Sequence, residues 1–270
     1  MATRAPPSAL EPYLRLPPET SLILLTGTLG CSANWLLSRY VGNHLSLEDD
    51  DHSTVEPSAV LLVSWLRDAT FWKSEIRRTT GLDLTKAIHT NRFTFLDLLT
   101  TPTQDYQNLT KRLIDAITTL RMTRPTSKLI LLLDSPDIAL ATSSLTSQSL
   151  STLLLTVRSQ VHCTILSCSA DLPLLSAATQ STESWPTPIE VESAAFLASQ
   201  AHSARMVMSV RELETGAAKD VSGVLRVTRG GGCEAFDHID GDGSGEVREA
   251  ELLYLVQRDG NVKVFIRGNQ

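Results

Sequence analysis

The residues whose types and spacing could do chemistry lie where the first apolar run of the chain ends. The stretch LILLTGTLGCSANWLL (22–37) joins an apolar run to an amphipathic segment through a glycine-containing turn. A phosphate-binding loop has the same order of elements and reads G-x-x-x-x-G-K-[ST]. Aligned from Gly27, the pattern puts Ser32 at the second glycine, Ala33 at the lysine and Asn34 at the hydroxyl residue. The segment therefore has the order of elements of a nucleotide-binding loop but lacks the charged residue that the motif requires.

This loop is predicted to be degenerate. Backbone N–H groups beside Gly27 and Gly30 could still contact a phosphate, but phosphoryl transfer also requires the lysine and a hydroxyl group on Mg²⁺. We expect Gly27, Gly30 and Ser32 to form a former nucleotide loop or a subunit interface, with no catalytic residue and no bound cofactor. The plainer alternative is a glycine turn that simply joins a strand to a helix.

A second partial motif lies in KLILLLDSPDIAL (128–140). Asp134 ends a buried apolar run, and a carboxylate at the end of such a strand holds Mg²⁺ in nucleotide-binding folds. No glutamate follows it to activate a water molecule. Asp134 could instead cap the next turn together with Ser135 and Pro136. Two partial motifs in the correct order of strands favour a RecA-like fold.

A modest basic cluster lies on one predicted helix and the turn before it. The stretch VLLVSWLRDATFWKSEIRRTTGLDL (60–84) carries Arg67, Lys73, Arg77 and Arg78. Clustered cations on one helix are typical of a contact with RNA or with another subunit. The alternative is a solvated helix face on which these charges alternate with Glu75.

The stretch DGDGSGEVREAE (240–251) matches the calcium loop of an EF-hand. Asp240, Asp242, Ser244, Glu246 and Glu251 take positions 1, 3, 5, 7 and 12 of that loop. An EF-hand needs a helix on each side, whereas a glycine-rich turn precedes this stretch and a predicted strand follows it. We therefore expect an acidic loop between two antiparallel strands, no metal, and at best millimolar affinity for calcium.

The elements that position these residues alternate along the chain. Short apolar runs, typical of strands buried on both faces, lie at 22–26, 59–64, 93–97, 128–133 and 161–167. Stretches with helical spacing of apolar residues separate them at 33–42, 68–81, 105–122 and 143–160. This alternation predicts a parallel sheet with helices on both faces, which is an α/β domain of three layers.

Beyond residue 190 the pattern changes from long helical stretches to short alternating ones. A predicted helix at 190–202 leads into four alternating runs between 204 and 268, and Asp259-Gly260 is a good hairpin turn. We therefore expect antiparallel C-terminal strands at one edge of the sheet. The predicted organisation is a flexible N-terminus (1–15) and a single domain (16–270), with mobile insertions near 46–58, 178–188 and 230–250.

Composition narrows the class of protein. The net charge of −6 argues against a surface coated with cations for nucleic acid, and 42% of the residues are hydrophobic, as in a globular protein. The four cysteines form no C-x-x-C pair, and no apolar segment is long enough for a membrane span. No histidine lies at a useful spacing from the serine- and threonine-rich stretches. We expect an intracellular protein that does not contact a membrane.

Several of these features together resemble the Elongator complex protein 6 family, whose members are non-catalytic RecA-like subunits. The shared features are the V-S-[WF]-L-R-D turn from Val63 to Asp68, the pair Phe71-Trp72 and the G-L-D-L sequence that ends at Leu84. The family also has an opening loop without the lysine and a C-terminal hairpin like LLYLVQRDGNVKVFIRG. The resemblance covers about residues 21–267, with gaps at the acidic and polar insertions.

The resemblance implies a function in an assembly. A member of this family forms a hetero-hexameric RecA-like ring with Elongator complex proteins 4 and 5. The ring binds tRNA and supports wobble-uridine modification, while the catalytic Elongator subcomplex carries out the chemistry in the cytoplasm and nucleus. Two other hypotheses remain from the residues themselves: a divergent ATPase of the RecA/KaiC type with an atypical loop, and a calcium-binding module formed by residues 240–251.

Overall fold

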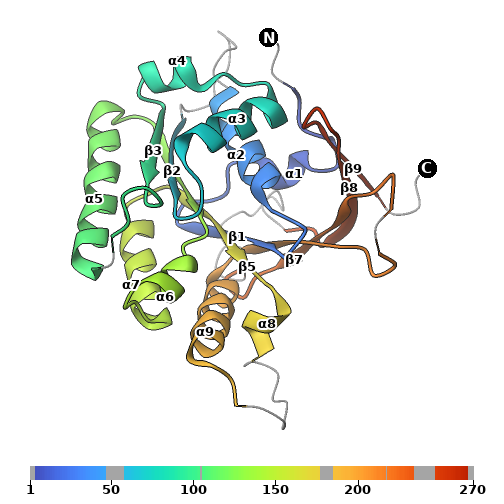
Figure 1. Ribbon diagram of the computed structural model, residues 1–270. Coiled ribbons are helices and arrows are strands. Elements are labelled where there is room, and N and C mark those ends of the chain that lie inside the picture. Colours follow the sequence, from blue (N-terminus) through green and yellow to red (C-terminus); the bar gives the residue numbers. More distant parts are fainter. Residues whose placement is uncertain are drawn as a thin grey trace.

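The computed structural model describes residues 4–46, 58–103, 105–176, 185–216, 218–233 and 247–266. Within these ranges nine strands form a single sheet in the order β3-β2-β4-β5-β1-β6-β7-β8-β9 (Figure 1). The strands are β1 (Ser21–Gly27), β2 (Ser58–Ser64), β3 (Phe93–Asp97), β4 (Lys128–Asp134), β5 (Cys163–Ser169), β6 (Met206–Arg211), β7 (Gly223–Arg229), β8 (Ala250–Val256) and β9 (Val262–Ile266).

Neighbouring strands from β3 to β6 are parallel, as their unbroken apolar runs predict. Successive side chains of a strand point to opposite faces of the sheet. In β1, Ile23 and Leu25 therefore join one hydrophobic core, and Leu22 and Leu24 join the other. Both faces of the parallel part are covered, which gives the predicted three layers.

Helices form the two outer layers (Figure 1). Residues of α1 to α4 pack in the first core, and residues of α5, α6, α7 and α9 pack in the second. The helices are α1 (Glu11–Leu14), α2 (Asn34–Ser46), α3 (Ala69–Thr80), α4 (Leu84–His89), α5 (Tyr106–Thr123), α6 (Ile138–Thr142), α7 (Ser147–Arg158), α8 (Leu172–Leu175) and α9 (Pro188–Ser203).

The C-terminal strands extend the sheet with antiparallel pairs. β6 is the junction, because it is parallel to β1 and antiparallel to β7. β7, β8 and β9 then follow as antiparallel neighbours. Gly260 has a φ of +81° in the turn between β8 and β9, a conformation that glycine adopts without steric cost. The predicted fold class, a mostly parallel sheet with antiparallel C-terminal strands, is confirmed.

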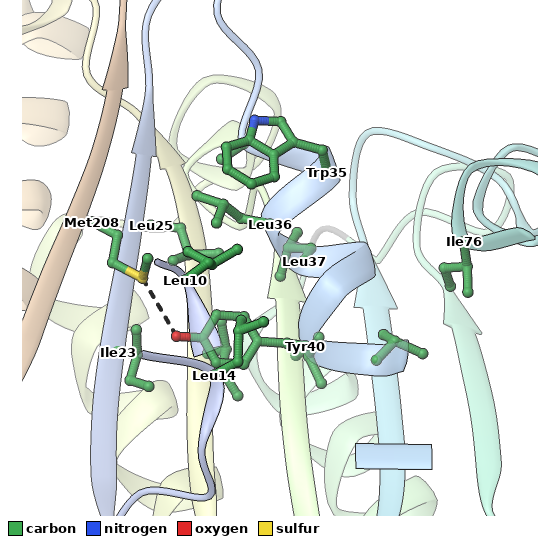
Figure 2. Close-up of a cluster of buried hydrophobic side chains, with 14 of the residues drawn as sticks. Leu10, Leu14, Ile23, Leu25, Trp35, Leu36, Leu37, Tyr40, Ile76 and Met208 are labelled. Atoms are coloured by element: carbon green, nitrogen blue, oxygen red, sulfur yellow. Dashed lines mark hydrogen bonds between the residues drawn. The ribbon is translucent and has the colours of Figure 1, made fainter. Parts of the chain in front are cut away.

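Within the predicted flexible N-terminus (1–15), residues 4–15 pack against the rest of the domain. Leu10 and Leu14 are fully buried against α2, and Figure 2 shows them beside Tyr40. The Tyr40 hydroxyl donates to the carbonyl oxygen of Tyr13 at 2.8 Å, and the Arg4 N–H donates to the carbonyl oxygen of Thr80 at 2.7 Å. Two leucines four residues apart on one helical turn supply an apolar face that offsets the entropy lost in ordering this segment.

The predicted insertions lie largely outside the described residues, which omit 47–57, 177–184 and 234–246. The elements beside them are well defined: α2 ends at Ser46, Thr187 forms a capping box at the start of α9, and β7 ends at Arg229. In the described ranges no helix combines the length and the apolar character that a membrane span requires.

Candidate functional site

The loop between β1 and α2 is short and closed on itself. Thr28 and Cys31 form an isolated antiparallel bridge, in which the Cys31 N–H donates to the Thr28 carbonyl oxygen at 2.8 Å. A side chain on Gly27 would place its Cβ 2.7 Å from the Cys31 carbonyl oxygen, so only glycine fits there. Gly30 has a φ of +87° and lies against the Glu212 carboxylate. The two glycines are therefore needed for the tight turn itself.

Besides the Cys31 N–H, two further N–H groups of this loop have partners within the chain. The Leu29 N–H donates to Oδ1 of Asp171, and the Asn34 N–H donates to the Ser32 hydroxyl at 3.2 Å. With Glu212 beside Gly30, two carboxylates border the turn. Negative charge at the place where a phosphate would bind opposes its binding.

Asp134 lies at the carboxyl end of β4, on the same edge of the sheet, and is completely buried. Arg67 Nη1 lies 3.0 Å from Oδ1 and 3.2 Å from Oδ2 of Asp134. The Ser64 hydroxyl donates to Oδ2 at 2.7 Å. This carboxylate is paired and hydrogen-bonded within the chain, which is the condition under which a buried charge is tolerated.

The same guanidinium connects Asp134 to the degenerate loop. With its amide oxygen directed toward Arg67, Asn34 accepts hydrogen bonds from Nη2 and Nε of that arginine, each at 3.1 Å. Its amide nitrogen then donates to the Ser32 hydroxyl at 2.8 Å. Asn34 stands where a phosphate-binding loop has its hydroxyl residue. In such a loop a lysine and Mg²⁺ supply the positive charge. Here Arg67, from the turn that follows β2, supplies a positive charge that is already paired with Asp134.

The turn that the sequence singles out between Val63 and Asp68 positions this arginine. The Arg67 N–H donates to the Ser64 hydroxyl at 2.9 Å, which folds the turn back on the end of β2. Asp68 then caps α3 by accepting from the Phe71 N–H at 2.8 Å, and the Phe71 ring centroid lies 5.2 Å from Arg67 Cζ. The residues of this turn therefore hold the guanidinium in place.

A second buried carboxyl group lies near the first. Asp137 accepts from the Ser169 N–H at 3.1 Å. Burial raises the pKa of Asp137 to about 6, and the nearby Asp134 adds to this increase. Burial likewise raises the pKa of the Cys168 thiol well above its usual value. For both groups, burial stabilises the neutral form relative to the charged form, compared with the same group in water.

The predicted basic cluster is divided between two places in the structure. Arg67 belongs to the loop network, whereas Lys73, Arg77 and Arg78 line a separate cleft between α3 and α4. Arg78 is exposed and forms an ion pair at 2.8 Å with Glu75, whose side chain is buried. Lys73 and Arg77 are exposed and have no ion pair among the described residues.

Sequence reasoning missed Arg4, which also lines this cleft and pairs with Asp259 at 3.4 Å. Its partners lie at the end of α3 and in the turn between β8 and β9. No local pattern could have identified it, because those partners lie far along the chain. It also missed Asp171 and Glu212, whose proximity to the loop depends on the order of the strands.

Most of the predicted calcium loop lies outside the described residues, since Asp240, Asp242, Ser244 and Glu246 are not among them. Glu251, at the twelfth position of the motif, belongs to β8 and pairs with Arg211 at 3.6 Å. An EF-hand requires this glutamate to turn toward the ion from a helix. Its position in a strand agrees with the expected context.

Exposed apolar side chains lie beside the degenerate loop. Leu29 is 87% exposed and Leu172 is 82% exposed. The two residues come from adjacent segments, because the Leu29 N–H contacts Asp171, the neighbour of Leu172. The edge of the sheet where this fold could hold a nucleotide is therefore apolar at its tip and acidic around it.

No protein-family model matches this chain, and no curated protein sequence matches it. Solved structures share its fold. A KaiC-like protein from the hyperthermophilic archaeon Pyrococcus horikoshii aligns with a TM-score of 0.55 over 92% of this chain and 91% of that protein, at 14% sequence identity. At this identity the likeness shows the fold alone. The chain has a RecA/KaiC-like α/β fold.

Proposed function

We propose that this chain is a non-catalytic subunit of the Elongator complex. In this proposal it assembles with Elongator complex proteins 4 and 5 into a hetero-hexameric RecA-like ring. The ring binds tRNA and supports wobble-uridine modification, which the catalytic Elongator subcomplex carries out in the cytoplasm and nucleus. The proposal joins the resemblance in the sequence to the RecA/KaiC-like fold.

The observation that carries the proposal is the network in which Arg67 joins Asn34 to Asp134. The V-S-W-L-R-D turn, which is one of the several features that carry the family resemblance, supplies this arginine. A loop without lysine, whose neighbouring carboxylate is paired with the chain's own guanidinium, has little to offer a nucleotide. This edge of the sheet has the loop of a nucleotide-binding fold but lacks the lysine that catalysis needs. We therefore propose that it contacts another subunit.

The apolar tip beside the loop supports a subunit contact at the same edge. Apolar side chains as exposed as Leu29 and Leu172 favour burial against another protein. Asp171 and Glu212 form an acidic border around this tip. A neighbour with an apolar patch and cations around it would be complementary in both respects.

Binding of tRNA is expected to be a property of the ring. With a net charge of −6, the single chain should bind RNA weakly and lose that binding as salt increases. An assembled ring can combine basic residues from several subunits. The proposal therefore assigns the affinity for tRNA to the assembly and not to this chain alone.

The test is assembly with the proposed partners. We expect the native mass of this chain, co-expressed with Elongator complex proteins 4 and 5, to be that of a hetero-hexamer. Leu29→Glu should abolish the ring, because it places a charge at the contact. Leu155→Glu is the matched control, since Leu155 is 59% exposed on α7, away from the loop. If no complex forms with either partner, the whole proposal is contradicted. If the ring forms and Leu29→Glu leaves it unaffected, the proposed contact at this face is contradicted.

The alternative is a divergent ATPase of the RecA/KaiC type. The fold agrees with it, because the KaiC-like structure has the same architecture. The loop does not favour it, because Ala33 cannot replace the lysine that stabilises charge on the phosphates. Hydrolysis of ATP by the isolated chain distinguishes the two hypotheses.

A further inference from the structure

The cleft between α3 and α4 is a concave surface separate from the degenerate loop. It has a volume of about 1000 Å³. Residues of both helices line it, and Arg4 and Asp259 close it from the N-terminal segment and the turn between β8 and β9. A cleft of this size can hold several side chains of a bound segment.

The charge in the cleft is positive. Two of its four arginine and lysine side chains are paired: Arg78 with Glu75 at 2.8 Å and Arg4 with Asp259 at 3.4 Å. The carboxylate of Asp83 caps α4 by accepting from the Thr85 N–H at 2.9 Å. Lys73 and Arg77 remain, exposed and with no ion pair in the described ranges.

Carboxylates in the cleft only partly offset these cations. Four side chains of arginine and lysine line it, against the two carboxylates of Asp83 and Asp259. Asp83 lies near Arg77 and also caps α4, so its charge is shared between the cation and the start of the helix. Cations gathered on a protein with a net charge of −6 are a local feature, and they indicate an anionic partner.

The apolar residues of the cleft indicate what kind of anion it takes. Leu82, Leu84 and Ile88 lie among the lining residues, and Ile88 is partly exposed. Proteins that bind single-stranded nucleic acid stack its bases on aromatic side chains, and no aromatic residue is among the described residues that line this cleft, apart from the imidazole of His89. Phosphates would use the cations and leave the apolar surface uncovered. A peptide with both acidic and apolar side chains would use both.

We propose that this cleft binds an acidic segment of a partner protein, in which carboxylates contact Lys73 and Arg77 and apolar side chains cover Leu82 and Ile88. The identity of that partner rests on the proposed function, which places this chain in an assembly of several proteins. The binding itself depends only on the cleft and is measurable on the isolated full chain. RNA is the competing occupant.

The experiment uses a short fluorescein-labelled peptide in which Asp and Glu alternate with Ile and Leu, and measures fluorescence anisotropy. We expect saturable binding that weakens as salt increases. Lys73→Glu together with Arg77→Glu should lower the affinity at least about tenfold, since two attractive contacts become repulsive. The control is Lys111→Glu with Arg121→Glu, which makes the same change in net charge on the exposed face of α5. This control should change the affinity for the peptide less than about twofold.

Two further peptide measurements distinguish specific binding in the cleft from attraction to charge alone. A peptide with Asn and Gln in place of Asp and Glu should not bind, and Ile88→Ser should weaken the acidic peptide severalfold. The proposal would be overturned if the acidic peptide did not bind, or if both charge-reversal variants lost affinity equally. It would also be overturned if the peptide failed to bind while a labelled tRNA bound and the changes at Lys73 and Arg77 abolished that binding. Ring assembly, measured separately by native mass, shows whether the proposed function fails with it.

Discussion

Arg67 connects the two halves of the candidate site, and its removal tests how much stability that connection supplies. Arg67→Ala leaves Asp134 fully buried without its cation. We expect the free energy of unfolding to fall by about 3–5 kcal/mol, the usual cost of breaking a buried ion pair on one side. Urea unfolding measures it.

Two variants make this test specific. Arg124→Ala removes another arginine, whose guanidinium donates to the carbonyl oxygen of Thr90, and should cost about 1 kcal/mol. Arg67→Ala with Asp134→Asn should recover part of the loss, because the amide carries no charge. Equal effects of Arg67→Ala and Arg124→Ala would show that the Arg67–Asp134 pair contributes no special stability.

His44 makes the stability of the fold depend on pH. Burial, and to a smaller extent the neighbouring His162, lowers the pKa of His44 from 6.5 to about 4. Both of its ring nitrogens are buried and lack hydrogen-bond partners among the described residues. The unfolded chain therefore binds the proton more tightly than the folded one, so this residue destabilises the fold as pH falls from about 6.5 to about 4.

The expected loss of stability is about 3 kcal/mol, because the pKa of His44 falls from 6.5 to about 4 on folding. Asp137 acts in the opposite direction, because its pKa is raised from 3.8 to about 6 on folding. Its contribution to the stability of the fold is fully present below pH 3.8 and is lost as the pH rises through about 6. The comparison of wild type with His44→Phe isolates the histidine. We expect the variant to lose less stability in urea unfolding between about pH 7.5 and 4. Parallel losses in both proteins would rule out His44 as the cause.

Among the elements, the crossing of α2 and α3 depends on a glycine inside a helix. Gly42 lies in the interior of α2, where alanine would favour the helix by about 1 kcal/mol. A Cβ at this position would lie 2.6 Å from Cγ2 of Thr80 on α3. Overpacking of this kind costs about 1–3 kcal/mol, so the close approach of the two helices accounts for the glycine.

We therefore expect Gly42→Ala to destabilise the protein even though it improves the helix. Thr80→Ser removes the nearest atom that the new Cβ would meet, the Thr80 methyl group, and leaves Thr80 Cβ at 2.9 Å. It also keeps a hydroxyl that can donate to the Ile76 carbonyl oxygen. Gly42→Ala should cost about 1–2 kcal/mol in the wild type and clearly less in the Thr80→Ser background. A double-mutant cycle by urea unfolding measures the coupling. Additive effects would mean that the two helices adjust without strain.

Within the whole molecule, the arrangement of the loop edge predicts that the isolated chain does not hydrolyse ATP above background. The loop has no lysine, and carboxylates from three other segments surround it, of which Asp134 is already paired. Transition-state charge on the phosphates would find no free cation from this loop. Release of phosphate at saturating ATP and Mg²⁺ measures the rate. Turnover that Gly30→Asp abolishes would favour the divergent ATPase.

The sequence alone determined the fold class and the chemistry that the loop lacks. Apolar runs with helical stretches between them predict a parallel sheet covered on both faces, because each pattern permits one kind of burial. The antiparallel C-terminal strands follow in the same way from alternation and from Asp259-Gly260. The absence of a lysine at Ala33 is a matter of residue identity and needs no structure.

Only the tertiary structure decided which side chains meet. β2 lies beside β4, so the turn after Ser64 reaches Asp134, and the basic cluster that looked continuous along one helix is divided between two sites. Arg4 and the buried Leu10 and Leu14 gain their roles from α2, α3 and the β8–β9 turn, which lie far along the chain. A local sequence pattern indicates which side chains of a segment can be buried. Which other segment packs against them depends on the order of the strands in the sheet.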